Sequence, residues 1–578
     1  MKFFHVYNEE CIKGLEKNNL LNKDSGFKIQ HDFPVPVHLL FNQFAAKGSK
    51  LYNLVKENHI PLYIDRIAGG STYFPYTFDK SLIEEYRDLL GDSFLGFQLH
   101  ESGSNRRLSE WPNVIRAMGS KGPYDLAELK QRFMSSYRTS ADGTRLSRLG
   151  HDTLEYFATL KYAETIPAFL AEMRELFQRR LDDTSNNILA VDSYYLFTRM
   201  QDQMGIRTFM PEVGAQICLM RQAVALARGM AQNAGKTWGT YYECWRADLD
   251  ENEKISCSMP CYNLDPINEW YLTQEIHPDD FTTHGQNGGS SRLLQERIYY
   301  HSLMSGADYL AEEWGLNCSY TDMQTFDLSP YGKLKKDFID RALELQGVKS
   351  VTPFAIVLPK EYECVFVPNP FEVHEFGVHN DRYMDVPLTP EEKDFFGHIE
   401  DVLKLFFARN GKTFGTERHV LNNSRYGDVA DIIYEDASDK TFDRYEYLID
   451  ASPDGRFAKA HPARKVVESG DFAKLTHDMD TLIAQIMPIY ADGLHWLVST
   501  DSKGRRFLTV FNNEGNQRTT ADGDVINHKF DQKITITLNV PGELRIFKDA
   551  REEIHLKKTG ENTYCATVSA ADFVIFAF

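Results

Sequence analysis

Residues 206–245 read IRTFMPEVGAQICLMRQAVALARGMAQNAGKTWGTYYECW. The stretch opens with an apolar run, continues with a long segment whose apolar residues recur at i, i+3, i+4 and i+7, and ends in a second apolar run. The short runs are typical of buried strands and the long segment of an amphipathic helix. Gly235 stands where a helix C-cap is expected, just before the second run. The stretch therefore predicts a strand–helix–strand unit.

The same alternation extends from about residue 30 to residue 350. Strands alternating with helices indicate a parallel sheet, and this number of repeats favours a closed (β/α)8 TIM barrel. An open doubly wound sheet is the alternative, but no glycine-rich phosphate loop follows the first predicted strand. Seven strands are predicted, and the eighth is expected in residues 102–186 or 246–290. The seven are VPVHLLFN (35–42), PLYIDRIA (61–68), FLGFQLHE (94–101), NILAVDSYY (187–195), IRTFMPEVG (206–214), TWGTYYECW (237–245) and ADYLAEEWG (307–315).

Two further regions follow the predicted barrel. A buried strand at 352–362, a helix at 398–412 and later strand-like runs predict a flavodoxin-like α/β domain, although no nucleotide-binding motif occurs in it. After residue 490 the pattern changes to short alternating strands, which predict a β-sandwich. The predicted division is a barrel catalytic domain with an N-terminal extension (1–350), a flavodoxin-like α/β domain (351–490) and a C-terminal β-sandwich (491–578).

Charge and cysteine usage limit the classes of partner and compartment. Lys and Arg number 64 against 83 Asp and Glu, and the net charge of −19 weighs against a nucleic acid or an anionic membrane as partner. The N-terminus lacks the apolar segment of a signal peptide, and no run approaches the ~18 apolar residues of a transmembrane helix. The 8 cysteines are scattered, which indicates a reducing compartment. We therefore predict a cytoplasmic protein.

Several catalytic and metal motifs are missing from the sequence. It contains neither the G-x-S-x-G elbow of serine hydrolases nor the H-E-x-x-H motif of zinc proteases. Cys257 and Cys261, with His277 and His284 nearby, match no strong zinc pattern, so cysteines in a loop are the favoured interpretation. We expect no metal and no cofactor.

Carboxylates stand at the ends of the predicted strands, where a barrel has its active site. Glycoside hydrolysis uses a pair of carboxylates, and aromatic rings beside them contact the sugar and raise the pKa of the acid. One such Glu is more often a helix-cap or salt-bridge residue, but four consecutive strand candidates end in an acid. Asp65, beside Arg66, is interpreted as a structural ion pair. The set comprises Asp65, Glu101, Asp192, Glu212, Glu243, Glu312 and Glu313, accompanied by Tyr194, Tyr195, Tyr241, Tyr242, Trp245 and Trp314.

Three of these carboxylates are the predicted catalytic residues. Glu212, between an apolar strand and a long helix, is the acid/base candidate. Glu313 is the first choice of partner, because it faces inward if Tyr309 and Ala311 do. Glu243 is the alternative nucleophile. The predicted substrate-binding residues are Glu101, Asp192, Tyr194, Tyr242, Trp245, Glu312 and Trp314; His100 and the loop after it are equally compatible with sugar binding and with a solvated loop.

The segment HSLMSGADYLAEEWG (301–315), followed by YGKLKKDFIDRALEL and TPFAIVLP, resembles the passage from the last barrel strand into the second domain of the family 42 β-galactosidases. The resemblance implies that ADYLAEEWG is strand eight, that the missing strand precedes residue 187, and that the protein is a homo-oligomer. The acid/base Glu of that family follows an Asn at the end of strand four, and no Asn-Glu ends a predicted strand here. The resemblance therefore carries over the glycoside hydrolase class and not the substrate.

The predicted function is a glycosidase that cleaves a soluble oligosaccharide or glycoside with a pair of Glu carboxylates. The first alternative is a non-catalytic carbohydrate-binding barrel, which keeps the aromatics and lacks a working acid pair. The second is a cytosolic sugar phosphorylase, which needs a cationic phosphate pocket. Its candidate cations are Arg106, Arg107 and Arg246.

Overall fold

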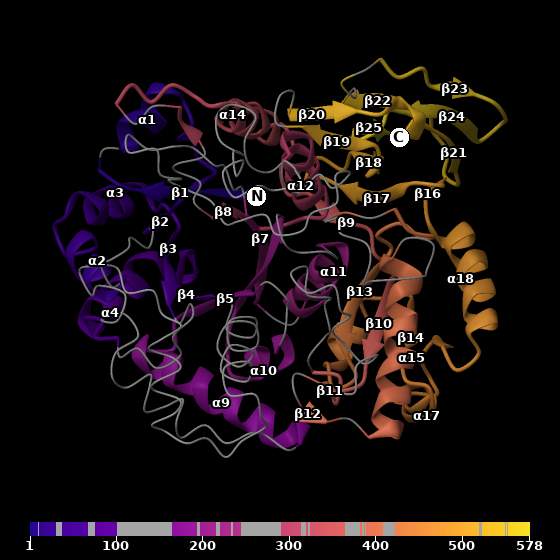
Figure 1. The fold of residues 1–578 in the computed structure, drawn as a ribbon, viewed down its shortest axis with the longest axis horizontal. Helices are drawn as coiled ribbons and strands as arrows, with labels where there is room; N and C mark the ends of the chain where they lie inside the picture. The colour runs from indigo at the N-terminus through magenta and orange to yellow at the C-terminus, as the bar shows by residue number, and fades with distance from the viewer. Residues whose placement is uncertain are drawn as a thin grey trace.

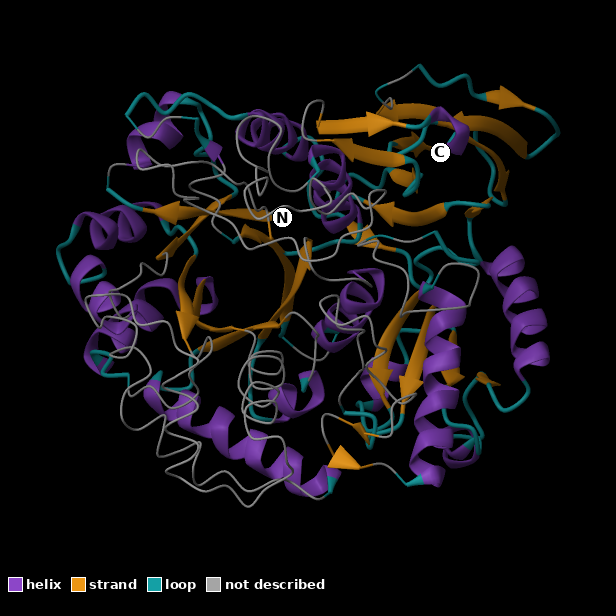
Figure 2. Cartoon of the chain, viewed as in Figure 1, coloured by secondary structure: helices purple, strands orange, loops and turns teal. Residues whose placement is uncertain are grey.

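The computed structural model is a mixed α/β protein in which a ring of strands lies beside two further groups of sheets (Figures 1 and 2). Helices surround the ring, and the chain then passes to a parallel sheet flanked by α15 and α18 and ends in antiparallel strands. The residues that the structure describes are 1–9, 11–29, 37–67, 76–100, 165–192, 197–214, 220–232, 235–243, 291–313, 319–321, 324–363, 382–383, 386–387, 389–408, 421, 423–519, 523–548, 551 and 553–578.

Eight parallel strands close into a barrel, and their order in the ring is their order in the chain. The ring closes where β1 pairs with β8, with Lys2 opposite Tyr309 and Phe4 opposite Ala311. The predicted closed parallel barrel is therefore confirmed. Its strands are β1 (Lys2–Tyr7), β2 (Ser25–Ile29), β3 (Leu62–Ile67), β4 (Phe94–His100), β5 (Ile188–Asp192), β6 (Thr208–Gly214), β7 (Thr237–Glu243) and β8 (Tyr309–Glu312).

Helices pack around the outside of this ring (Figure 2). Polar caps define several of their first turns: the Asp79 side chain accepts from the Ser81 and Leu82 N–H groups at the start of α4, as an N-cap does. Among the helices that the structure describes, none combines the length and apolar character that a membrane span requires. The helices are α1 (Cys11–Lys17), α2 (Val37–Phe44), α3 (Lys50–Asn58), α4 (Lys80–Leu90), α9 (Ile166–Asp183), α10 (Thr198–Gln203), α11 (Met220–Ala231), α12 (Arg292–Met304) and α14 (Pro330–Ala342).

The N-terminal part of the barrel differs from the prediction. Segment 35–42, predicted as the first strand, is helical from Val37 onward, because Val37, Leu40 and Phe41 share a buried helical face while Leu39 is exposed. The predicted N-terminal extension supplies β1 and β2 instead. The ring is complete without a strand from 102–186 or 246–290. The other six predicted segments contain β3 to β8.

Buried side chains fill the interior of the barrel, as in other barrels of this size. An irregularity in β4 changes which residues contribute: Gly96 has φ +86°, and the register between β3 and β4 shifts there. A Cβ at Gly96 would overlap the carbonyl oxygen of Asn187, so the close approach requires glycine. The interior cluster consists of Phe4, Tyr63, Leu95, Leu189, Val191, Met210, Tyr241 and Ala311, with Tyr309 packed against it.

A four-stranded parallel sheet follows the barrel, in the order β13-β10-β14-β15. It packs against the barrel through α11, where a Cβ at Gly229 would overlap the carbonyl oxygen of Ile432 in β13. Its elements are β10 (Phe354–Leu358), α15 (Pro390–Phe407), β13 (Ala430–Tyr434), α16 (Asp439–Phe442), β14 (Tyr447–Asp450), α17 (Arg456–Ala460), β15 (Val466–Glu468) and α18 (Phe472–Ile486), with the two-residue strands β11 (Arg382–Tyr383) and β12 (Val386–Pro387) pairing separately.

The C-terminal strands form two main antiparallel sheets, β16-β21-β24-β23 and β22-β25-β18-β17-β9. The second sheet takes its edge strand β9 (Lys349–Ser350) from the segment just after the barrel. The remaining strands are β16 (Ile489–Asp492), β17 (His495–Thr500), β18 (Arg506–Phe511), β19 (Asn516–Thr519), β20 (Gly523–Ile526), β21 (Gln532–Leu538), β22 (Arg545–Lys548), β23 (Lys557–Lys558), β24 (Thr563–Val568) and β25 (Phe573–Ala577).

A buried polar junction joins the three parts of the molecule at Asp428, just before β13. One oxygen of Asp428 accepts from Arg221 Nε of α11 at 2.8 Å, and the other lies 2.8 Å from Nε2 of both His301 in α12 and His495 in β17. Burial alone raises the pKa of Asp428, but Arg221 and then His495 outweigh it and hold that pKa well below its usual range. Burial, followed by the charge of Arg221, lowers the pKa of His495 to about 3.

We expect the junction to make the protein sensitive to acid. The unfolded His495, with a pKa of ~6.5, binds a proton that the folded imidazole does not accept until about pH 3. Unfolding therefore takes up protons in this window, and the free energy of unfolding falls as the pH falls, by roughly 3 kcal/mol from His495 alone at pH 4.5. Thermal melts between pH 7.5 and 4.5 measure the slope. A His495→Asn variant should start less stable and lose less on acidification; equal slopes would contradict the assignment.

Candidate functional site

The carboxyl ends of the barrel strands meet at one mouth, where this fold builds its active sites. Three titratable side chains stand there on alternate strands: His100 ends β4, Glu212 lies near the end of β6, and Glu313 directly follows β8. Alternate strands supply one layer of a barrel interior, so these residues belong to one level. Their exposed fractions are 1 %, 0 % and 3 %. They are therefore removed from bulk water before any substrate binds.

These side chains form one cluster. A ring nitrogen of His100 and one carboxylate oxygen each from Glu212 and Glu313 all lie within 4.8 Å of one another. Both glutamates are among the predicted catalytic residues, and the structure brings them together. It also places Glu313 on the inward side of β8, in step with Tyr309 and Ala311.

His100 is oriented by its neighbour on the same strand. Gln98 Nε2 lies 2.7 Å from His100 Nδ1, and because an amide nitrogen can only donate, Nδ1 accepts. The proton of the neutral ring then sits on Nε2, which is a hydrogen-bond donor. Phe97 belongs to the outer core, so after the irregularity at Gly96 the even-numbered residues of β4 face inward. From the sequence, His100 is predicted as no more than a sugar contact, and Gln98 is not among the predicted site residues.

A buried lysine lies beside this cluster. Lys28 of β2 is completely buried, donates to the carbonyl oxygen of Glu312 at 2.6 Å, and lies 3.5 Å from a carboxylate oxygen of Asp65. The Tyr241 hydroxyl donates to Asp65 at 3.4 Å, and the Tyr241 ring packs edge-on against His100, with centroids 5.8 Å apart. Lys28 is not among the predicted site residues; its signal in the sequence is a single cation inside the apolar run GFKI.

Two predicted substrate-binding residues face away from the mouth. The Glu312 carboxylate accepts from Tyr299 of α12 and from Lys335 of α14, the latter at 2.6 Å. The Tyr242 ring packs edge-on against Tyr299 in the outer core. Burial and then the charge of Lys335 hold the pKa of His5, also on this outer side, well below its usual range. The prediction is therefore corrected for Glu312 and Tyr242: they join barrel to helices and do not line the mouth.

Other predicted site residues lie outside the described residues. β5 and β7 end at Asp192 and Glu243, whose side chains are not described. The remaining predicted site residues outside the described part are Glu101, Tyr194, Trp245 and Trp314. The same holds for the candidate phosphate-binding cations Arg106, Arg107 and Arg246, and for Cys257, Cys261, His277 and His284, which are considered above as zinc ligands.

Among the residues that the structure describes, two buried clusters have the composition of a metal site. One is His100, Glu212 and Glu313; the other is His301, Asp428 and His495. In the second, Asp428 already accepts from Arg221, and a guanidinium beside the carboxylate opposes a cation. That cluster is therefore a hydrogen-bonded junction. In the first, the hydrogen bond from Gln98 leaves the proton of the neutral His100 ring on Nε2, which favours a hydrogen-bond donor over a metal ligand.

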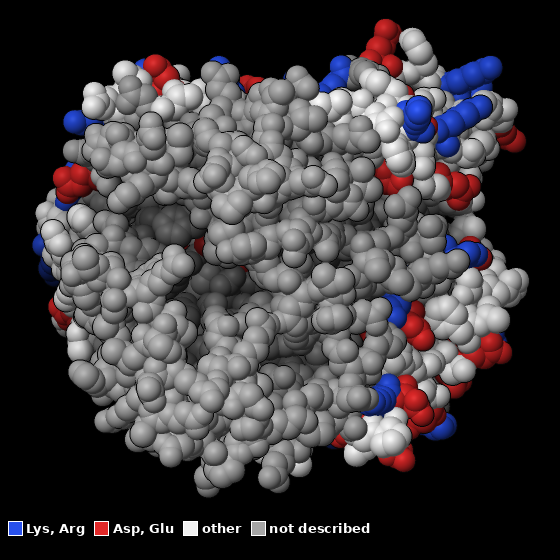
Figure 3. Space-filling model, in the orientation of Figure 1, with Lys and Arg blue, Asp and Glu red and all other residues white. Residues whose placement is uncertain are grey.

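Charges of both signs mix on the surface. On the face shown in Figure 3, Lys and Arg lie among Asp and Glu along the edge formed by the middle and C-terminal sheets. Nucleic-acid binding requires clustered cationic residues, so this mixed edge adds nothing in favour of such a partner.

No protein-family model matches this chain, and no curated protein matches it. Among solved structures, the catalytic module of a family 98 glycoside hydrolase from Streptococcus pneumoniae TIGR4 is similar over 100% of this chain and 98% of its own, with 8% identity and a TM-score of 0.46. Alpha-L-fucosidase isoenzyme 2 from Paenibacillus thiaminolyticus is similar over 95% and 99%, with 9% identity and a TM-score of 0.40. Both are glycosidases, but likenesses this distant carry no argument about the present site.

Proposed function

We propose that this protein is a retaining glycoside hydrolase in which Glu212 is the acid/base and Glu313 the nucleophile. One observation supports this above all: two buried carboxylates at the barrel mouth offer oxygens within 4.8 Å of each other. Retaining glycosidases hold their two carboxyl groups ~5–5.5 Å apart, whereas inverting ones need ~6.5–9.5 Å to admit a water between them. The short spacing favours direct attack by a carboxylate.

The short distance between Glu212 and Glu313 determines how the two carboxyl groups are protonated. Two buried carboxylates this near repel each other, so one keeps its proton and serves as the acid. Lys28 donates to the carbonyl oxygen of Glu312, which is bonded to the backbone nitrogen of Glu313. The ammonium of Lys28 therefore lies one peptide bond from Glu313, and 3.5 Å from a carboxylate oxygen of Asp65. This position favours an ionised Glu313 and a protonated Glu212.

The reaction takes two steps. A Glu313 oxygen attacks the anomeric carbon while the bond to the leaving oxygen breaks, and Glu212 gives its proton to that oxygen. Glu212 then takes a proton from a water whose oxygen attacks the anomeric carbon, which releases the sugar and restores the Glu313 carboxylate. The Nε2–H of His100 donates to the negative charge of the pair. This role keeps the imidazole neutral throughout.

The rest of the substrate site stays a proposal built on the sequence. Glu243 is the alternative nucleophile, at the end of β7. The substrate is a soluble oligosaccharide or glycoside. Its further contacts are proposed at Glu101, Asp192, Tyr194, Trp245 and Trp314.

Trapping the covalent intermediate tests the proposal. We expect 2-deoxy-2-fluoro aryl glycosides of a sugar that the enzyme hydrolyses to inactivate it. The fluorine slows hydrolysis of the covalent glycosyl–enzyme so strongly that this intermediate accumulates. Peptide mass spectrometry should place the added mass on Glu313. A label on Glu243 would move the nucleophile to β7. A broad aryl glycoside screen, run with and without phosphate, precedes the trapping: phosphate-dependent turnover would indicate the phosphorylase, and sugar binding without turnover the non-catalytic barrel.

A second candidate function has its own observation, because one imidazole and two carboxylates are also a ligand set for a divalent metal. The hydrogen bond from Gln98 favours the metal-free chemistry, since it leaves the proton on Nε2 of His100. Chelation separates the two. Glycosidase activity that survives EDTA supports the acid–base roles, and activity lost to EDTA and restored by Mn²⁺ or Zn²⁺ would make the three residues ligands.

We also propose that the chain forms three domains: the barrel (1–350), a flavodoxin-like domain (351–490) and a β-sandwich (491–578). The order β13-β10-β14-β15 supports the second, since it follows the 2-1-3-4 order of flavodoxin-like sheets. We propose a cytoplasmic location from the scattered cysteines, and a homo-oligomer from the resemblance to family 42 β-galactosidases. Light scattering that gives the 66.5 kDa monomer at micromolar concentration would contradict the oligomer.

A further inference from the structure

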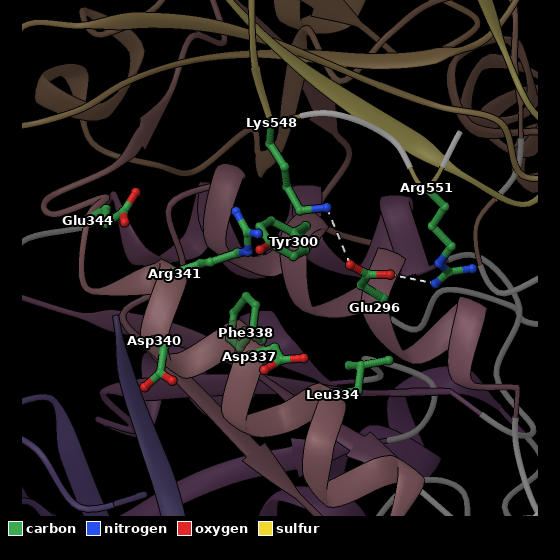
Figure 4. Close-up of a pocket in the computed structure, with 10 residues that line it drawn as sticks. All are labelled: Glu296, Tyr300, Leu334, Asp337, Phe338, Asp340, Arg341, Glu344, Lys548 and Arg551. Carbon is green, nitrogen blue, oxygen red and sulfur yellow. Dashed lines mark hydrogen bonds and ion pairs between the residues drawn. The ribbon is translucent and has the colours of Figure 1, made fainter. Parts of the chain in front are cut away.

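A cavity of ≈ 700 Å³ lies on the outer flank of the barrel (Figure 4). Its lining comes from α12, from α14 and Glu344 just after it, and from the end of β22 with the residues that follow, and it includes no residue of a barrel strand. The cavity is therefore separate from the mouth that holds Glu212 and Glu313. Its volume is within the ~300–1,000 Å³ of ordinary small-molecule sites.

The floor of the cavity is aromatic and carries one unsatisfied hydroxyl. The rings of Tyr300 and Phe338 pack edge-on, with centroids 5.2 Å apart. Tyr300 is 2 % exposed, and its hydroxyl has no hydrogen-bond partner among the described residues. Burial raises the pKa of Tyr300, so the group stays an O–H. A buried hydroxyl without a partner is destabilising, which indicates that a partner is missing.

The walls carry charges of both signs. Glu296 holds Lys548 at 3.4 Å and Arg551 at 2.5 Å, as Figure 4 shows. The guanidinium of Arg341, which is exposed, lies beside the Tyr300 ring, with Asp337 on the same helix. In all, four carboxylates and three cationic groups line the cavity. An anion would meet the carboxylates, and a cation would meet the cationic side chains.

We infer that this cavity binds a neutral oligosaccharide, at a second site outside the barrel mouth. Sugar hydroxyls both donate and accept, so they satisfy carboxylates, a guanidinium and a tyrosine O–H together. Movement of the exposed Arg341 side chain opens the Tyr300 hydroxyl to the ligand. The choice of a sugar over another neutral polar ligand rests on the proposed function. The site holds substrate near the catalytic domain without taking part in the chemistry.

Calorimetric titration tests the inference. The full-length protein carrying Glu212→Gln, which suppresses turnover, is titrated with neutral β-linked gluco-, xylo- and galacto-oligosaccharides of two to four rings. Adding Arg341→Ala should weaken binding of at least one of them ~10-fold or more by removing a charged donor from the site. Lys333→Ala, which removes an exposed cation of the same helix outside the cavity, should leave binding unchanged.

The outcomes separate this inference from the catalytic proposal. A titration in which Arg341→Ala weakens no binding event, whatever sugar still binds at the barrel mouth, or the absence of binding to every sugar at millimolar concentration, overturns the second site even if the wild type hydrolyses glycosides. If sugar binding requires Arg341 but the wild-type protein hydrolyses no glycoside, the second site is supported and the catalytic proposal fails. In an active wild type, Arg341→Ala should leave kcat on a small aryl glycoside unchanged.

Discussion

Replacing Glu212 by glutamine should lower the turnover of an unactivated oligosaccharide by about 10²–10⁴-fold, or roughly 3–5 kcal/mol of activation free energy. Glutamine keeps the shape and hydrogen-bonding reach of the side chain but has no proton to give to the leaving oxygen. An activated aryl glycoside needs little protonation of its leaving group, so its first step should lose much less. Steady-state kcat on both substrates measures the difference.

Two controls make this result specific. Glu175→Gln changes the same functional group in an exposed helix pair with Arg179 and should keep full activity. Thermal unfolding of the Glu212 variant should show that its fold is retained, since removal of a buried carboxylate from a repelling pair does not leave a charge unpaired. A folded Glu212→Gln protein with the wild-type rate on the oligosaccharide would move the acid/base role to another residue.

Asp428→Asn should destabilise the protein by about 3–5 kcal/mol, the cost of breaking a buried ion pair by removing one partner. The substitution leaves Arg221 with a neutral amide in a site that excludes water. It also removes an acceptor shared by His301 and His495. The loss should appear as a lower urea midpoint followed by a probe of overall structure such as circular dichroism.

The matched control for this variant is Asp480→Asn. Asp480 pairs with Arg425 on the surface of the same region, with 43% and 48% of their side chains exposed. Exposed ion pairs contribute ~0–1 kcal/mol, so this variant should remain close to the wild type. Equal losses in the two variants would show that burial of the junction adds nothing to its stability.

The sequence predicted the barrel because most of its strands stand in apolar runs separated by long helical patterns. The errors lie where the pattern is short. Helix α2 spans only Val37–Phe44, and over eight apolar-rich residues the helical period cannot be told from a buried strand. β1 and β2 are also short, with 6 and 5 residues. The segment that is predicted as an N-terminal extension therefore forms two strands in the structure, β1 and β2.

The candidate site was predictable only in part. Simple alternation along β8 placed Glu313 inward, and the same rule, applied from Ala311 and Tyr241, would have sent Glu312 and Tyr242 outward. Alternation fails in β4, because the irregularity at Gly96 lets Leu95, Gln98 and His100 share the interior. Such a shift depends on the register with neighbouring strands. Single-sequence periodicity does not contain that information.

The closing pair of the barrel has a consequence for how the protein is made. Lys2 pairs with Tyr309, so β1 leaves the ribosome long before its partner strand exists. At roughly 5–20 residues per second, the interval is on the order of 15–60 s. Throughout it, the edge of β1 offers unpaired backbone groups to any passing strand. Yield during synthesis should therefore depend on chaperones that shield nascent chains, far more than the stability of the finished ring would suggest.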